Sequence, residues 1–194
     1  MRINTANLIS NILHPFIVSL LLILLLSFKA TADTFDAIKW MIISIALSLL
    51  PIIIIIVYLV RSRRIKSYSI NIRKERTSVY LFTSICTSIS CIILILLNAP
   101  SILLAAFVAG FSAVAIFMCI NLLWKISLHT AFISAAVTIL IILYGSLAII
   151  TLVLIPMTAW ARIVLKHHTL AQTVSGALLA TLIALIIFYS FGLI

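Results

Sequence analysis

Residues Thr130–Ala161 read TAFISAAVTILIILYGSLAIITLVLIPMTAWA and contain no charged side chain. As one α-helix this segment would be about 48 Å long, well beyond a hydrocarbon core of about 30 Å. The apolar run is broken at Gly145-Ser146, a dipeptide that favours a turn. We therefore predict two membrane-spanning helices that are joined at Gly145.

The rest of the chain is equally apolar. Of its 194 residues, 65% are hydrophobic and 8% are charged, whereas a soluble domain is about 45–50% apolar and about 25% charged. This composition excludes a water-soluble globular fold and predicts an all-α, polytopic helical membrane bundle of six to seven transmembrane helices. The seven predicted spans are Leu8–Phe28, Trp40–Val60, Ser78–Leu97, Ile102–Trp124, Ile126–Tyr144, Ser146–Leu165 and Thr173–Ile194.

The basic residues predict the orientation of these spans. The net charge is +10, and with a cytoplasmic N-terminus every Lys and Arg except Lys29 and Lys39 falls on the cytoplasmic side. We interpret the positive charge as this orientation signal and expect membrane lipids, with no nucleic acid, as partners. The expected organisation is one integral-membrane domain, 1–194, with two spans in 1–60, a basic cytoplasmic loop in 61–77 and a core in 78–194.

Three segments place polar residues at the predicted cytoplasmic face. In WKISLHT, residues 124–130, Lys125 and His129 flank Ser127, which is a suitable N-cap for the next helix. A helix N-terminus with its unpaired N–H groups suits an anion. The alternative interpretation is an interfacial lysine, a capping serine and an incidental histidine.

The second segment, WARIVLKHHTLAQTVSGALLA, covers residues 160–180. Arg162 ends one apolar run and His168 precedes the next, and ionisable residues at this depth are functional candidates because they are costly in a membrane. Snorkelling to the interface would explain Arg162 and Lys166 without a function, but it would not explain His168.

The third segment is the basic loop. Most of its cations are expected to set orientation and to contact anionic headgroups, while Arg73 and Arg76 lie nearest the following helix and are the better site candidates.

Two histidines and several cations at one interface suit phosphate chemistry. The cations would bind a phosphoryl group, one histidine would attack phosphorus, and the other would protonate the leaving oxygen. We expect no metal and no other cofactor, because Asp33 and Asp36 fall on the opposite side and Glu75 stands alone.

The last part of the chain, from about Asn121, resembles the membrane-bound type-2 phosphatidic acid phosphatase superfamily, which includes lipid phosphate phosphatases and haloperoxidase-like proteins. Its second motif, Pro-Ser-Gly-His, corresponds to Ile126-Ser127-Leu128-His129. Its third motif, Ser-Arg, five residues, His, three residues and Asp, corresponds to Ala161-Arg162, five residues, His168, three residues and Gln172.

This resemblance implies a phosphatase of lipid phosphates or prenyl (di)phosphates with a phosphohistidine intermediate. His168 would be the nucleophile and His129 the acid for the leaving group. Gln172 would orient the nucleophile. The implied phosphate-binding residues are Arg162, Ser127, Lys125, Arg76 and Arg73.

The sequence departs from the family pattern where Gln172 replaces the aspartate of the third motif. The first motif, a Lys followed by Arg-Pro, has two equal candidates: Lys66 with Arg73, and Arg76-Thr77. The alternative function is therefore a catalytically impaired member that binds a phospholipid or polyprenyl phosphate, or that forms a homo-oligomer or a subunit of a membrane complex. Binding of haem by two of the four histidines is disfavoured because these histidines lie at the ends of the apolar segments. A transport function is disfavoured because no predicted helix carries a charge near its middle.

Overall fold

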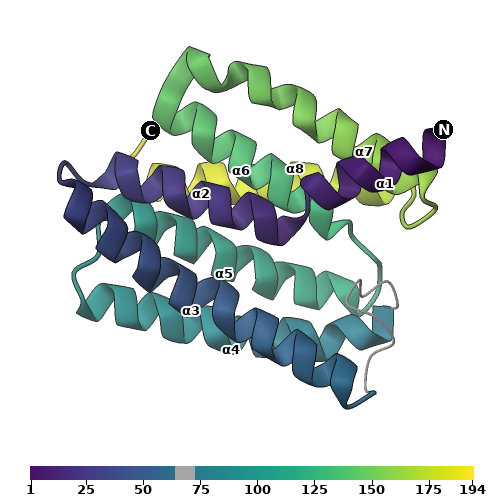
Figure 1. The fold of residues 1–194 in the computed structure, drawn as a ribbon, viewed down its shortest axis with the longest axis horizontal. Coiled ribbons are helices and arrows are strands. Elements are labelled where there is room, and N and C mark those ends of the chain that lie inside the picture. Colours follow the sequence, from purple (N-terminus) through teal and green to yellow (C-terminus); the bar gives the residue numbers. More distant parts are fainter. Residues whose placement is uncertain (64–72) are drawn as a thin grey trace. The chain divides into compact units, whose positions relative to one another are not determined.

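The computed structural model describes residues 1–63 and 73–194, with the side chains of 73–76 left out. In these ranges the chain forms eight α-helices and one 3-10 helix, η1, and it forms no β-strand (Figure 1). The all-α prediction is confirmed for this part of the chain. The elements are α1 (Arg2–Ile12), α2 (Pro15–Ala30), α3 (Thr34–Arg61), α4 (Arg73–Leu96), α5 (Ser101–Asn121), α6 (Leu128–Tyr144), η1 (Gly145–Val153), α7 (Leu154–Val164) and α8 (Leu170–Ser190).

The chain divides into two compact units. One unit joins the N-terminal segment Met1–Leu22 to the C-terminal segment Ile126–Ile194, and it contains α1, α6, η1, α7 and α8. The other unit is Ile23–Lys125 and contains α3, α4, α5 and the second half of α2. We call them the terminal unit and the middle unit.

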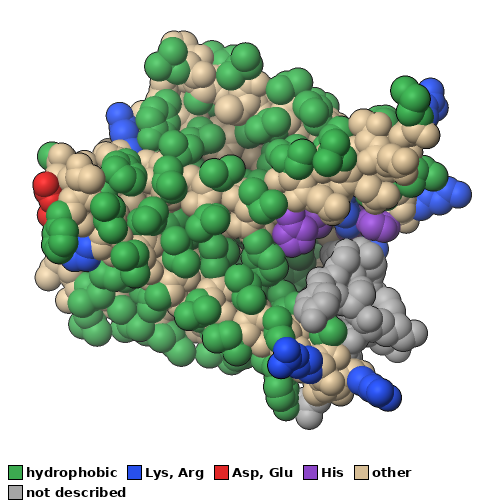
Figure 2. All heavy atoms as spheres, viewed as in Figure 1, with side chains coloured by type: hydrophobic (Ala, Val, Ile, Leu, Met, Phe, Trp, Pro, Cys, Tyr) green, Lys and Arg blue, Asp and Glu red, His purple; other side chains and the backbone are tan. Residues whose placement is uncertain are grey.

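Among the described residues, six helical stretches are long and apolar enough to cross a membrane. They agree with the predicted spans to within a few residues, except that α1 and α2 together extend the first one and that the fifth and sixth predicted spans form one stretch. Hydrophobic side chains are spread over the whole length of the face seen in Figure 2, as expected for helices that lipid surrounds. The six stretches are Arg2–Ala30, Thr34–Arg61, Thr77–Leu96, Ser101–Asn121, Leu128–Val164 and Leu170–Ser190.

The stretch Leu128–Val164 reverses direction at Gly145. This residue has φ 62° and ψ −137°, a conformation that suits glycine. Both η1 and α7 then pack against α6, and Figure 1 shows the hairpin as adjacent green ribbons. The predicted turn is confirmed. At about 2.0 Å per residue in η1 and 1.5 Å in α7, the returning arm is about 34 Å long, enough to cross a bilayer core.

The first predicted span, Leu8–Phe28, is interrupted in the structure. Helix α1 ends at Ile12, and α2 begins at Pro15. Proline has no backbone N–H and disfavours helical geometry in the residue before it, so the helix breaks at His14. As a result α1 is a separate helix that packs on α7.

In the middle unit, α4 packs between α3 and α5. Thr83, Thr87 and Ser90 form a buried stripe on α4. The Ser90 hydroxyl donates to the Leu47 carbonyl of α3 at 2.9 Å. Hydroxyl groups of this kind commonly join helices in membranes.

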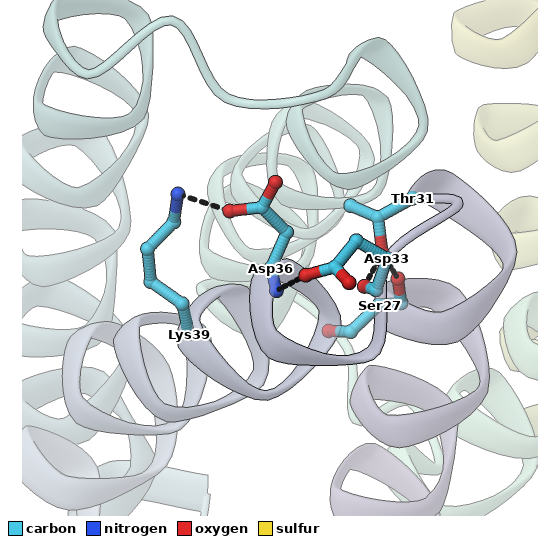
Figure 3. A network of polar contacts seen from close by, with 5 residues as sticks. All are labelled: Ser27, Thr31, Asp33, Asp36 and Lys39. Atoms are coloured by element: carbon cyan, nitrogen blue, oxygen red, sulfur yellow. Dashed lines mark hydrogen bonds and ion pairs between the residues drawn. The ribbon is translucent and has the colours of Figure 1, made fainter.

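Both aspartates of the chain lie where α3 begins: Asp33 is the N-cap in the connection from α2, and Asp36 is in the first turn of α3 (Figure 3). The Asp33 carboxylate accepts the Asp36 N–H at 3.1 Å and so caps α3. Asp36 in turn pairs with Lys39 at 2.6 Å, and Thr31 donates to the Ser27 carbonyl at 3.0 Å. These contacts give the two acids a structural role at a helix start.

Candidate functional site

The turn between α7 and α8 positions two of the predicted site residues. Arg162 lies in the last turn of α7 and is 3% exposed. Its carbonyl oxygen accepts the N–H groups of His167 at 3.1 Å and His168 at 3.3 Å. Lys166, with φ 54°, makes the tight turn that allows this. The turn therefore brings His168 back beside the end of α7.

The ring of His168 is held by Gln172. Nδ1 of His168, which is 6% exposed, lies 3.1 Å from Oε1 of Gln172. The same oxygen accepts the Thr169 N–H at 3.2 Å, and the Thr169 hydroxyl accepts the Gln172 N–H at 3.3 Å, which completes a capping box at the start of α8. Because an amide oxygen only accepts, Nδ1 carries the ring proton and the lone pair of the neutral imidazole is at Nε2.

The start of α6 is joined to the same part of α8. Ser127 is the N-cap of α6, where its hydroxyl accepts the Thr130 N–H at 3.5 Å. The Ser127 N–H donates to the Gln172 carbonyl at 3.2 Å, and the Thr130 hydroxyl donates to the Thr173 carbonyl at 3.1 Å. Ser127 and Thr130 are fully buried. The start of α6 and the start of α8 are therefore hydrogen-bonded to each other.

His129 lies in the first turn of α6 and is half-buried. Its ring centroid is 5.2 Å from that of His14, and the two rings are nearly perpendicular. His14 lies at the break between α1 and α2, where its Nδ1 accepts the Phe16 N–H at 3.3 Å. His14 was not predicted to belong to a phosphate site.

Helix α1 also reaches Arg162. Nη1 of Arg162 donates to the hydroxyl of Ser10 at 2.9 Å, a contact between residues far apart in the sequence. Ser10 is 4% exposed. His14, four residues after Ser10, contacts the ring of His129. Ser10 and His14 therefore belong to the same cluster as the predicted residues.

A continuous set of hydrogen bonds thus runs through the terminal unit, from Ser127 by way of Gln172, His168 and Arg162 to Ser10. In the view of Figure 2, histidine side chains reach the surface. We call this cluster, completed by His14 and His129, the histidine-arginine site. The described residues contain no group of three or more His, Cys, Asp or Glu side chains that could hold a metal ion.

Three predicted site residues lie in the middle unit. Lys125 is half-buried after the end of α5. Arg73 and Arg76 lie in α4, within the segment that was predicted as a loop, and their side chains lie outside the described residues. A role of these three cations in phosphate binding stays a prediction.

No protein-family model, curated protein or solved structure matches this chain. The fold alone therefore defines the class: an all-α helical protein whose described part contains six stretches able to cross a membrane.

Proposed function

We propose that this chain is an integral-membrane phosphatase that hydrolyses lipid phosphates or prenyl (di)phosphates through a phosphohistidine intermediate. The observation that carries the proposal is the orientation of His168. Its Nδ1 is bonded to Gln172, its lone pair is at Nε2, and its backbone adjoins the buried Arg162. A nucleophile held by an orienting acceptor beside a guanidinium suits attack on a phosphoryl group.

The proposed reaction has two steps. First, Nε2 of His168 attacks phosphorus, the bond from phosphorus to the lipid oxygen breaks, and His129 gives its proton to the departing alkoxide. Second, water attacks the phosphohistidine, His129 takes a proton from that water, and the P–N bond breaks. Inorganic phosphate leaves, and His168 and His129 return to their starting states.

Binding of the phosphoryl oxygens is assigned to cations and to backbone N–H groups. Arg162 has a planar guanidinium that can bind two phosphate oxygens at once. The N-terminus of α6, capped by Ser127, adds N–H donors and a positive dipole. Lys125, Arg73 and Arg76 are proposed as further cations. In this proposal the chain lies in the cell membrane with a cytoplasmic N-terminus, and the headgroup chemistry takes place on the cytoplasmic side.

The test is phosphate release by the detergent-purified full chain from phosphatidic acid, phosphatidylglycerol phosphate and prenyl phosphates. His168→Ala should lower release by more than about a thousandfold, because it removes the nucleophile. His167→Ala is the matched control, since it removes the neighbouring imidazole and should retain most of the activity. Equal release by the wild type and His168→Ala would contradict the mechanism.

One observation favours a second function. Gln172 already serves in the capping box of α8, and its amide gives His168 an acceptor without charge. A site of this kind could bind a polyprenyl phosphate or phospholipid without turning it over. Wild-type protein that releases no phosphate from any substrate, yet retains a phosphorylated lipid that Arg162→Ala does not retain, would support this binding function over catalysis.

A further inference from the structure

Helix α1 packs closely on α7 because both helices present small side chains. Ala6, which is 0% exposed, and Ser10 lie one turn apart on the buried face of α1. On α7 the buried residues are Thr158, Ala161 and Arg162. Small residues four apart allow helix backbones to approach each other in a membrane. This packing brings the Ser10 hydroxyl within reach of a guanidinium on another helix.

The contact of Ser10 with Arg162 restricts the orientation of the Arg162 guanidinium. A buried guanidinium is costly unless its N–H groups are hydrogen-bonded. One of its donors, Nη1, is fixed by the Ser10 hydroxyl at 2.9 Å. Since rotation of the guanidinium would break this bond, Ser10 favours one orientation of the Arg162 fork.

The contact of His14 with His129 restricts the position of the His129 ring. The two imidazoles meet edge to face with centroids 5.2 Å apart, which is a favourable arrangement for aromatic rings. His14 is itself fixed by the N–H of Phe16 and by the contact of its ring with the Phe16 ring, with centroids 5.2 Å apart. A well-fixed ring beside His129 limits the positions that His129 can take.

We propose that α1 is the positioning element of the histidine-arginine site: Ser10 holds Arg162 for the phosphoryl oxygens, and His14 holds His129 for proton transfer. This inference rests on the proposed function for the identity of the ligand. It adds two residues that the family motifs do not include. It also makes the N-terminal helix part of the site.

The two residues should affect different kinetic constants. Arg162 contacts the phosphoryl group before and during the reaction, so Ser10→Ala should raise KM about tenfold with a smaller change in kcat. His129 acts only in proton transfer, so His14→Ala should lower kcat about tenfold with little change in KM. If α1 only supported the fold, both variants would change the same constant.

Conservative variants separate positioning from general damage. Ser10→Thr keeps the hydroxyl, so its KM should be close to that of the wild type. His14→Phe keeps an aromatic ring, so its kcat should be close to that of the wild type. Thr5→Ala is the matched control, because Thr5 is an exposed residue on α1 whose hydroxyl donates to the Met1 carbonyl at 3.2 Å, at the start of the same helix. It should leave both constants unchanged.

Binding of orthovanadate, a phosphate mimic, provides a readout without turnover. We expect the full-length wild type to bind it and Ser10→Ala to bind it about tenfold more weakly, with Ser10→Thr close to the wild type. Unchanged binding and kinetics in Ser10→Ala and His14→Ala would overturn the inference and leave the proposed function standing. A wild type that neither binds vanadate nor releases phosphate would instead refute the proposed function.

Discussion

Gln172 is the site residue whose substitution we expect to change the chemistry of the site most. Its side-chain oxygen accepts from the His168 ring and from the Thr169 N–H, so one amide both orients that ring and completes the capping box of α8. An uncharged acceptor fixes the tautomer of His168. In the proposed reaction, this acceptor would stabilise the positive charge on the His168 ring less well than a carboxylate would.

Gln172→Glu should therefore raise kcat. Glutamate has nearly the same shape and also fits the third position of a capping box, so the fold is preserved while His168 gains an anionic partner. We expect an increase of about tenfold in phosphate release, since hydrogen bonds to charged groups exceed neutral ones by about 1 kcal/mol or more. Gln172→Met, which removes the acceptor, should lower the rate. A rate of phosphate release that neither rises in Gln172→Glu nor falls in Gln172→Met would contradict the orienting role of Gln172.

Among the helices, the contact between α6 and α8 determines how the segments around Ser127 and Gln172 meet. The helices approach closely at Gly176. A Cβ atom there would lie 2.8 Å from the Ser127 carbonyl oxygen and 2.9 Å from the Ile126 side chain. Ser127 cannot move away without disturbing its own bond to Gln172. The absence of a side chain at Gly176 is thus required by the site.

Gly176→Ala should destabilise the protein by about 1–3 kcal/mol despite the better helix propensity of alanine, because the new methyl group overlaps a backbone atom. Gly110→Ala is the matched control: Gly110 is also within a helix, α5, and nothing lies within 4 Å of the position that its new methyl group would take. This control should be neutral or stabilising. The measurement is thermal unfolding in detergent, and equal melting temperatures for both variants would contradict the close packing.

For the molecule as a whole, the sequence predicts the helices well because each apolar run is bounded by charged or turn residues. Gly145 is the clearest case, since the length of the run requires a turn and glycine supplies it. The break at His14 could also have been predicted from Pro15, but the apolar residues on both sides favoured a continuous span.

The site was only partly predictable. Arg162 and His168 are recognisable because their spacing is local and a single turn connects them. Ser10 and His14 reach the site through packing of α1 on α7, and no local pattern encodes contacts between segments at opposite ends of the chain. The small residues Ala6 and Ser10, followed by the break at Pro15, are the sequence signal that could have indicated a separate, packed helix.

The hairpin at Gly145 predicts the membrane topology of the C-terminal part. In a chain without its three cysteines, Ser146→Cys should react with a membrane-impermeant maleimide added to intact cells, since residue 146 is exposed next to the turn. Lys166→Cys should react only after permeabilisation, because the arm that returns from Gly145 ends on the predicted cytoplasmic side. Labelling of both, or of neither, in intact cells would contradict this topology.

In the proposed mechanism, His168 carries the phosphoryl group during turnover. The direct measurement is to quench wild-type protein during turnover of a lipid phosphate in alkali, where phosphohistidine is stable, and to locate the phosphoryl group by mass spectrometry. We predict that it is on His168, is absent from His167, and disappears in His168→Ala. A phosphoryl group on another residue during turnover, or turnover that survives His168→Ala, would contradict this mechanism.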